Sequence, residues 1–247
     1  MHIDLKLEPQ SETLLPISAT TCPNASPRTD ATKPNLYFAY GSNLSPTQMK
    51  QRCYINPSLS AKPIAIAILP KWRWLICEAG YANVLPPPGM RVGAQNSEAA
   101  MKVPISGTED AVYGILYEMD LGDEQLLDGY EGVDWNAEVG GGEGEVGKDI
   151  RPREQGEGDY NKWYLPATVL KWIDGDHRLK TESGLVRVLV YVDEERVKVS
   201  SPKTEYIGRM NRAIRESVAL GVSEIWVEEV MRRFIPLGSV SDCIPGL

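Results

Sequence analysis

The segment 36–48 constrains the fold most strongly, because it changes abruptly from a strand pattern to a helix start. An apolar, aromatic run over 36–40 predicts a short strand that ends at Gly41. Ser45 then predicts a helix N-cap, with a proline at the first helical position and Gln48 completing a capping box. The sequence therefore predicts a strand, a sharp turn and a helix in immediate succession.

The turn itself, Tyr40-Gly41-Ser42-Asn43, has a clear physical use. Glycine permits a sharp bend and the close approach of a ligand, while the Ser42 and Asn43 side chains reinforce the turn. The helix start that follows offers backbone N–H groups and a partial positive charge, which suit a carboxylate. An ordinary strand-to-helix turn is the alternative, and the pattern is not that of a nucleotide-binding loop.

A second candidate feature is Glu131, which lies at the end of an apolar segment. Leu127 and Val133 are apolar neighbours, and Gly129 and Gly132 leave room for a ligand near the backbone. A partly buried carboxylate has a raised pKa, which improves it as a proton acceptor and donor. Glu131 is therefore the expected general acid–base.

Two neighbouring acids compete with Glu131 for this role. We expect Asp128 to serve in a cap or a turn and Asp134 to face solvent, although the residues alone exclude neither. Asp123 is expected to cap the short helix that precedes them.

Size and charge narrow the class of protein. The 247 residues suit one large domain or two small ones. The net charge of −8 argues against a nucleic-acid partner and against an anionic membrane surface. No apolar stretch approaches the roughly 18 residues of a membrane-spanning helix, and no signal peptide is evident, so we expect a cytoplasmic protein.

Histidine and cysteine usage excludes several kinds of chemistry. The only histidines are His2 and His177, so neither a Ser-His-Asp triad nor a zinc site is expected. The four cysteines show no metal-binding spacing and predict reduced thiols. Any reaction must use carboxylates, hydroxyls and backbone groups, with no metal.

Composition divides the chain into segments. Residues 1–34 predict a disordered tail, 35–236 a single domain, and 237–247 a C-terminal tail. Within the domain, 136–159 contains seven acidic and three basic residues among many glycines. Because glycine and charge oppose burial, we expect a flexible acidic insertion there, with an acidic partner-binding lid as the alternative.

Hydrophobic periodicity outlines the rest of the domain. Strands are expected near 36–40, 65–69, 72–77, 81–85, 111–119, 164–173 and 185–192, and helices near 203–220 and 225–234. Strand clusters with helices at their ends predict an α+β fold with a mixed, curved β-sheet or barrel.

Taken together, the Tyr-Gly-Ser-Asn turn and the later Glu131-Gly132-Val133 segment resemble the γ-glutamyl cyclotransferase family. The resemblance covers most of 36–236 and extends to three further segments, which are Gly80–Val84, Val112–Tyr117 and Ser201–Tyr206. The chain departs from the family at Arg212, where Gly is frequent, and at the acidic insertion. Both departures concern substrate preference more than chemistry.

The resemblance implies a γ-glutamyl cyclotransferase-like fold and a set of site residues. Glu131 is the implied catalytic residue. The implied substrate-binding residues are Tyr37, Phe38, Ala39, Tyr40, Gly41, Ser42, Asn43 and Tyr206. Tyr206 would donate a hydrogen bond in the pocket, with a core tyrosine on an amphipathic helix as the alternative.

The implied reaction is a lyase-type cyclisation of a γ-glutamyl compound to 5-oxoproline, with release of the attached amine. The α-amine of the substrate attacks its own γ-carbonyl, so the enzyme mainly selects the folded conformer. One amide replaces another, and no cofactor is required. The N–H groups of Gly41 to Asn43 would hold the α-carboxylate or the developing oxyanion.

Several points stay open at the level of sequence. The small-molecule substrate is a γ-glutamyl amino acid, a γ-glutamyl amine, glutathione, or a glutathione conjugate of a fungal-type secondary-metabolite pathway. The oligomeric state, including a homodimer, is undetermined. A non-catalytic module that binds a small acid or a partner on the same fold is the alternative function.

Overall fold

The computed structural model describes residues 35–107, 109–140, 146–175 and 183–238. The expected N-terminal tail, His177 and the end of the C-terminal tail lie outside the described residues. Among the helices that are described, none is both long and apolar enough to cross a membrane.

Five strands form a closed barrel, which confirms the expected α+β fold with a mixed, curved sheet. The strands are β1 (Asn35–Ala39), β5 (Ala111–Met119), β2 (Pro63–Pro70), β6 (Asn161–Trp172) and β7 (Leu185–Val192), in that spatial order. Neighbours pair antiparallel except β1 and β7, which pair in parallel. Both β1 and β7 therefore end at the same edge of the barrel, and β6 begins there.

Close packing around β1 fixes its orientation in the barrel. The Phe38 side chain is fully buried and lies against Gly114 of β5, where a Cβ atom would come within 2.4 Å of the Phe38 ring. The glycine in the middle of β5 is thus required for packing. Tyr37, at the preceding position of β1, is buried beside Tyr117 and Tyr191.

A separate two-stranded sheet, β3 (Arg73–Ile76) and β4 (Ala82–Leu85), follows β2. Short helical turns follow it, which are η2 (Pro88–Met90), η3 (Gly93–Asn96) and α3 (Glu98–Met101). The tight connection between β3 and β4 contains Gly80, whose φ of 79° suits glycine. This connection carries Tyr81 to the rim of the site described below.

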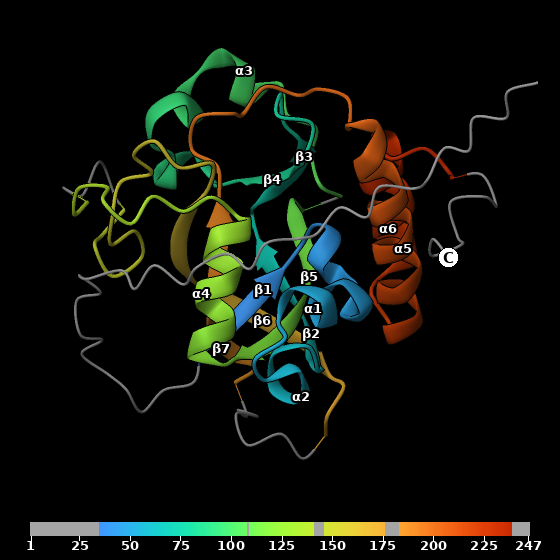
Figure 1. Cartoon of the computed structure of the whole chain (residues 1–247). Coiled ribbons are helices and arrows are strands. Elements are labelled where there is room, and N and C mark those ends of the chain that lie inside the picture. The colour runs from blue at the N-terminus through green and yellow to red at the C-terminus, as the bar shows by residue number, and fades with distance from the viewer. Residues whose placement is uncertain (1–34, 108, 141–145, 176–182, 239–247) are drawn as a thin grey trace, which may run out of the picture. The chain divides into compact units, whose positions relative to one another are not determined.

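Helices flank the barrel. They are η1 (Ser42–Leu44), α1 (Pro46–Arg52), α2 (Pro57–Ser60), α4 (Leu121–Tyr130), α5 (Thr204–Leu220), α6 (Glu224–Glu229) and η4 (Met231–Arg233). Figure 1 shows α4 and α5 on opposite sides of β1. The last helix is shorter than expected, because it stops at Glu229 and a 3₁₀ turn follows.

Two expected helix caps differ in detail. Ser45 caps α1 as predicted, but the Gln48 side chain turns away from the cap and bonds Ser42 and Asn43 instead. Asp120, and not Asp123, caps α4 by accepting the N–H of Gly122. Asp123 instead accepts the N–H groups of the chain that leaves α1. Gln48 thus bonds the turn that precedes α1, whereas Asp123 makes a contact between distant segments that local spacing cannot reveal.

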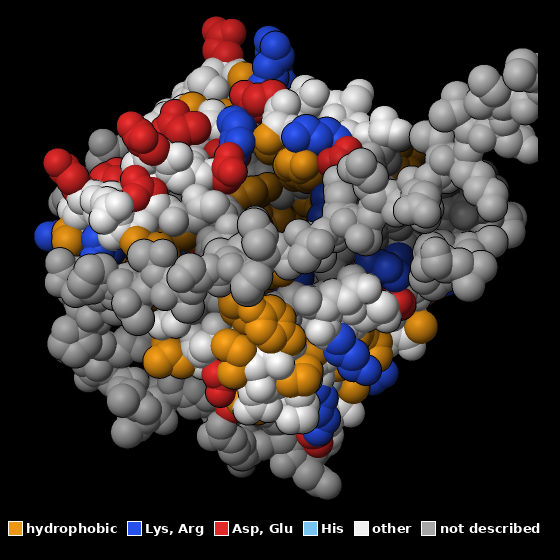
Figure 2. Space-filling view, in the orientation of Figure 1, with side chains coloured by type: hydrophobic (Ala, Val, Ile, Leu, Met, Phe, Trp, Pro, Cys, Tyr) orange, Lys and Arg blue, Asp and Glu red, His pale blue; other side chains and the backbone are white. Residues whose placement is uncertain are grey.

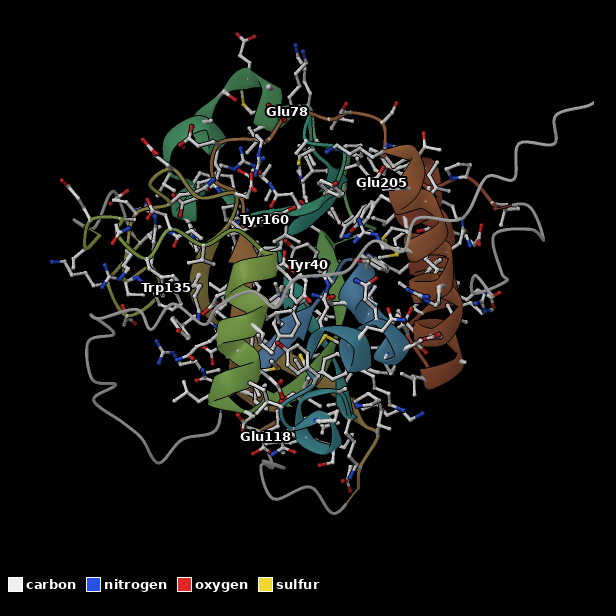
Figure 3. The ribbon with its side chains drawn as sticks, in the orientation of Figure 1. Tyr40, Glu78, Glu118, Trp135, Tyr160 and Glu205 are labelled. Carbon is white, nitrogen blue, oxygen red and sulfur yellow. The ribbon has the colours of Figure 1, made fainter. Side chains whose placement is uncertain are left out.

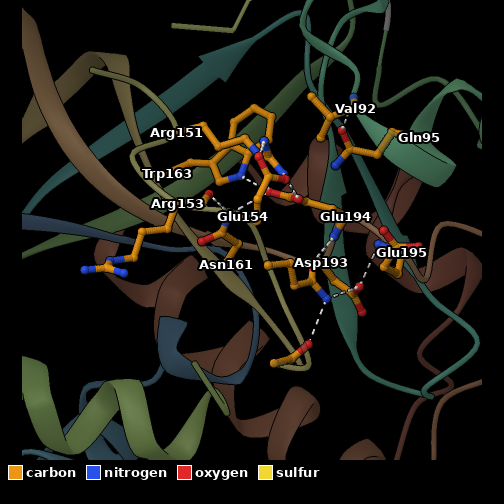
Figure 4. Close-up of polar contacts among 12 residues, drawn as sticks. Val92, Gln95, Arg151, Arg153, Glu154, Asn161, Trp163, Asp193, Glu194 and Glu195 are labelled. Atoms are coloured by element: carbon orange, nitrogen blue, oxygen red, sulfur yellow. Dashed lines mark hydrogen bonds and ion pairs between the residues drawn. The ribbon is translucent and has the colours of Figure 1, made fainter. Parts of the chain in front are cut away.

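The acidic segment 136–159 is partly buried where the structure describes it, although glycine and charge were expected to oppose burial there. Arg151 is 4% exposed and forms a bidentate ion pair with Glu194, at 2.8 and 2.7 Å (Figure 4). Gln155 accepts the N–H of Glu194 at 2.6 Å and is buried as well. A buried charge is tolerated when it is paired with an opposite charge. The ion pair therefore attaches this segment to the residues that directly follow β7.

Candidate active site

A cavity of about 640 Å³ opens beside the ends of β1 and β7. It is lined by most of the residues that the sequence singled out, namely Tyr37, Tyr40, Gly41, Ser42, Asn43, Glu131 and Tyr206. Phe38 and Ala39 do not line it, because both side chains are fully buried in the barrel. Within the expected run, the strand contributes Tyr37 to the cavity, and the turn that follows the strand contributes Tyr40 to Asn43.

The Glu131-Gly132-Val133 segment ends helix α4 in a Schellman motif. The Val133 N–H bonds the carbonyl of Asp128 at 3.0 Å, and the Gly132 N–H bonds that of Gly129 at 3.3 Å. Gly132 has a φ of 62°, and a Cβ there would lie 2.9 Å from Asp159. This local geometry explains why a glycine follows Glu131 and holds the carboxylate at the helix end.

Glu131 reaches the cavity with its carboxylate in contact with two side chains. Its Oε1 accepts a hydrogen bond from Asn43 at 3.2 Å and forms an ion pair with Arg52 at 2.9 Å. The side chain is 17% exposed. Burial raises the pKa of Glu131 above its usual value, and the guanidinium of Arg52 only partly offsets this effect.

Asn43 is oriented by a network within its own turn. The side chain of Gln48 donates to Asn43 Oδ1 at 3.0 Å and to Ser42 Oγ at 2.6 Å. With its oxygen engaged, Asn43 points its amide nitrogen to Tyr37 at 2.9 Å and to Glu131. The Tyr-Gly-Ser-Asn turn and Glu131 are therefore parts of one hydrogen-bonded unit.

Tyr206, from the first turn of α5, closes the other side of the turn. Its hydroxyl accepts the backbone N–H of Ser42 at 3.3 Å and would lie 3.0 Å from a Cβ on Gly41. Because Gly41 has no side chain, the Tyr206 hydroxyl can approach the backbone of the turn this closely. Burial raises the pKa of Tyr206 to about 12, so its hydroxyl keeps a proton that it can donate.

Further tyrosines form the walls, and sequence reasoning missed two of them. Tyr40 donates to the carbonyl of Tyr191 at 2.6 Å, and Tyr160 donates to that of Ala82 at 2.8 Å. Tyr191 donates to Asp128 at 2.7 Å. Figure 3 places the labelled Tyr40 and Tyr160 between α4 and α5. Burial raises the pKa of all three wall tyrosines, which remain neutral and fixed.

The two competing acids do not line the cavity. Asp128 is buried and pairs with Lys162 at 2.9 Å, in addition to accepting from Tyr191. Asp134 accepts backbone N–H groups of Asn136 and Glu157, which lower its pKa. Of these three carboxylates, Glu131 alone faces the cavity.

Four basic residues that line the cavity were not predicted from the sequence: Arg52, Arg196, Lys203 and Arg209. Only the spacing of Tyr206 and Arg209, one turn apart on an amphipathic helix, could have indicated a shared face. In the part of the chain that the structure describes, no cluster of three or more His, Cys, Asp or Glu could hold a metal ion. Cys53 and Cys77 are buried free thiols.

Comparisons with known proteins bear on the fold. No protein-family model and no curated protein matches the sequence. The structure is similar to that of YkqA from Bacillus subtilis, with a TM-score of 0.50 and 16% identity over 85% of this chain. It is also similar to a γ-glutamyl cyclotransferase, with a TM-score of 0.46 and 16% identity over 81% of this chain and 99% of that one. The likeness to YkqA shows a shared fold.

A glutathione-specific γ-glutamyl cyclotransferase from yeast aligns with a TM-score of 0.41 and 12% identity, over 81% of this chain and 97% of that one. The present chain spans 58% of the length of YkqA. Identities at this level bear on the fold alone. The activity has to be argued from the side chains in the cavity.

Proposed function

We propose that this protein is a γ-glutamyl cyclotransferase, which converts a γ-glutamyl compound to 5-oxoproline and a free amine. The observation that carries the proposal is the carboxylate of Glu131, held by Asn43 and Arg52 on the wall of a cavity. A carboxylate with a raised pKa suits the transfer of a proton between two nitrogen atoms.

In the proposed reaction, Glu131 takes a proton from the α-ammonium group of the substrate. The freed amine attacks the γ-carbonyl carbon, and the nitrogen of the new ring loses a second proton to solvent. Glu131 returns its proton to the leaving nitrogen as the bond to that nitrogen breaks, and the released amine takes up a proton from solvent. Because nucleophile and electrophile belong to one molecule, the cavity contributes mainly by enclosing the folded conformer. A positioned acid–base of this kind contributes about 10²–10⁴-fold to the rate.

The Tyr-Gly-Ser-Asn turn would hold the glutamyl part of the substrate. The N–H of Ser42 is engaged by Tyr206, so the donor that this pair offers to a ligand is the Tyr206 hydroxyl. We assign that hydroxyl to the substrate α-carboxylate or to the oxyanion that develops on the γ-carbonyl. Tyr37 and Tyr40 would shape the wall around the glutamyl chain.

One observation favours a second function, a non-catalytic module that binds a small acid. The ion pair with Arg52 stabilises the ionised form of Glu131 and opposes protonation. A carboxylate that stays paired with Arg52 would transfer protons poorly, but it would hold the ends of α1 and α4 together. Catalysis by Glu131 requires the ion pair to loosen, or to hold the carboxylate while its free oxygen accepts the proton.

The decisive experiment measures 5-oxoproline after incubation with γ-glutamyl-alanine, glutathione and a glutathione conjugate. Glu131→Gln should keep the fold and ligand binding and lose turnover by about 10²–10⁴-fold. Calorimetric binding and thermal unfolding of the variant serve as controls. Unchanged 5-oxoproline release by this variant would refute the role of Glu131, and binding without turnover by the native chain would favour the second function.

A further inference from the structure

The N-terminal part of α5 presents three side chains to the cavity at regular spacing. Lys203, Tyr206 and Arg209 all line it, and each is separated from the next by three positions. The Arg209 guanidinium lies 5.0 Å from the ring centre of Tyr206 and 5.9 Å from that of Tyr81. The Lys203 ammonium lies 4.5 Å from the ring centre of Tyr81. Two cations thus stack on two tyrosines that face each other edge to face.

These cations differ from the others on the cavity wall in their pairing. Arg52 is paired with Glu131 at 2.9 Å, and Arg196 with Asp159 at 2.7 Å. Arg209 forms neither a hydrogen bond nor an ion pair with any other residue in the described part of the chain. Two carboxylates lie near these cations, Glu78 on the cavity lining and Glu205, which accepts a hydrogen bond from Tyr81 at 2.9 Å. Among the described residues neither acid forms an ion pair with Lys203 or Arg209, so both cations remain available to a ligand.

The unpaired cations lie at the rim of the cavity, whereas the acid–base lies deeper. Lys203 is exposed and Tyr81 and Arg209 are half-buried, while Tyr37 and Asn43 are buried. Figure 2 shows a hollow on this face with hydrophobic side chains, tyrosine included, inside it and charged side chains around it. A substrate whose glutamyl part is enclosed near Glu131 would direct its leaving group towards this rim.

We propose that Arg209, assisted by Lys203, binds a carboxylate on the departing amine. This inference rests on the proposed function and selects among its substrates: γ-glutamyl amino acids or peptides, rather than γ-glutamyl derivatives of plain amines. A guanidinium offers a planar pair of donors that matches a carboxylate, and stacking on two rings holds that plane in place. Lys203 adds a point charge beside it.

The test compares two substrates that differ only in that carboxylate, γ-glutamyl-alanine and γ-glutamyl-ethylamide. For Arg209→Met, the ratio of kcat/KM for γ-glutamyl-alanine to kcat/KM for the ethylamide should fall about 10- to 100-fold relative to the native protein. Arg209→Gln is a second variant should the first fold poorly. Arg215→Met, an exposed arginine of α5 outside the cavity lining, is the matched control.

The ratio between the two substrates is the informative quantity. Arg209 also lowers the pKa of Glu131, so its loss can alter both rates, and the comparison cancels that effect. Equal losses with both substrates would show that Arg209 acts on the glutamyl part or on Glu131, and would overturn the inference. Equal rates in the native and variant proteins would overturn it as well.

A binding experiment separates this inference from the proposed function. Affinities for the two compounds are measured by calorimetry in a Glu131→Gln background, with and without Arg209→Met. A preference for γ-glutamyl-alanine that depends on Arg209 supports the inference, even if the native chain releases no 5-oxoproline. Release of 5-oxoproline without any such preference leaves the function standing and overturns the inference.

Discussion

Arg52 lies 2.9 Å from Oε1 of Glu131, and the two side chains are equally shielded from solvent, at 17% exposure each. The contact joins the end of α1 to the end of α4. Two effects act on the pKa of Glu131 in opposite directions. Burial favours the protonated form of the carboxylate, and the Arg52 guanidinium favours the ionised form. The balance between them decides the pH range in which Glu131 can accept a proton.

Removing Arg52 should move the acidic limb of the pH–rate profile to higher pH. The pKa of Glu131 is already raised by burial, so the ionised base is present above that pKa and is lost as the pH falls through it. Without the Arg52 guanidinium the largest effect that opposes burial is lost, so the pKa of Glu131 rises further. The measurement is kcat/KM against pH for Arg52→Met, with exposed Lys50→Met on the same helix as control. A limb that stays in place would contradict the assignment.

Gly132→Ala should destabilise the protein by about 1–3 kcal/mol, because the alanine must adopt a positive φ and its Cβ would press on Asp159. Gly129→Ala, on the same helix with open space around it, should instead stabilise by about 0.5–1 kcal/mol. Urea unfolding of the two variants checks the difference. Comparable stabilities would show that the Schellman ending does not hold Glu131.

Gln48→Leu should lower kcat/KM by about 10- to 100-fold while leaving the fold intact, since small displacements of reacting groups are costly. The reason is that Asn43 and Ser42 lose the donor that orients them. Gln51→Leu, an exposed glutamine one turn along α1, is the matched control. If both variants retain native kinetics, the orientation of Asn43 has no part in turnover.

Arg151→Met should cost about 3–5 kcal/mol of unfolding free energy, because Glu194 would remain buried without its cation. Replacing both partners, Arg151→Met with Glu194→Gln, should recover part of that loss. Lys148→Met, an exposed lysine in the same segment, should have an effect within about 0.5 kcal/mol. Denaturant titration of the three proteins provides the values, and equal midpoints would show that the ion pair contributes nothing.

Local patterns were enough to predict most strands and the long helix α5, but not the short helices α2 and α3. β5 and β7 have the expected bounds, Ala111–Met119 and Leu185–Val192, because β-branched, aromatic and other apolar residues predominate in both. The turn at Gly41 and the helix end at Gly132 also follow from short-range backbone requirements. These signals depend on neighbours in the chain, and a single sequence contains them.

Contacts between distant segments could not be predicted in the same way. Arg151 stands among glycines and acids and resembles a solvated residue, yet its partner Glu194 lies 43 positions later. Arg52 and Arg209 are ordinary helix arginines until the barrel places Glu131 and Tyr81 beside them. The turn and Glu131 were identified from sequence, whereas the charges that surround them required the tertiary arrangement.

The parallel pairing of β1 with β7 also has a consequence for biosynthesis. The Tyr40 hydroxyl and the Tyr191 carbonyl are 151 positions apart, so the first strand leaves the ribosome long before its partner exists. Until translation passes Val192, the nascent chain carries unsatisfied strand edges, which invite association with other chains. We expect prematurely terminated products to aggregate, and the cavity to take shape only at a late stage of synthesis.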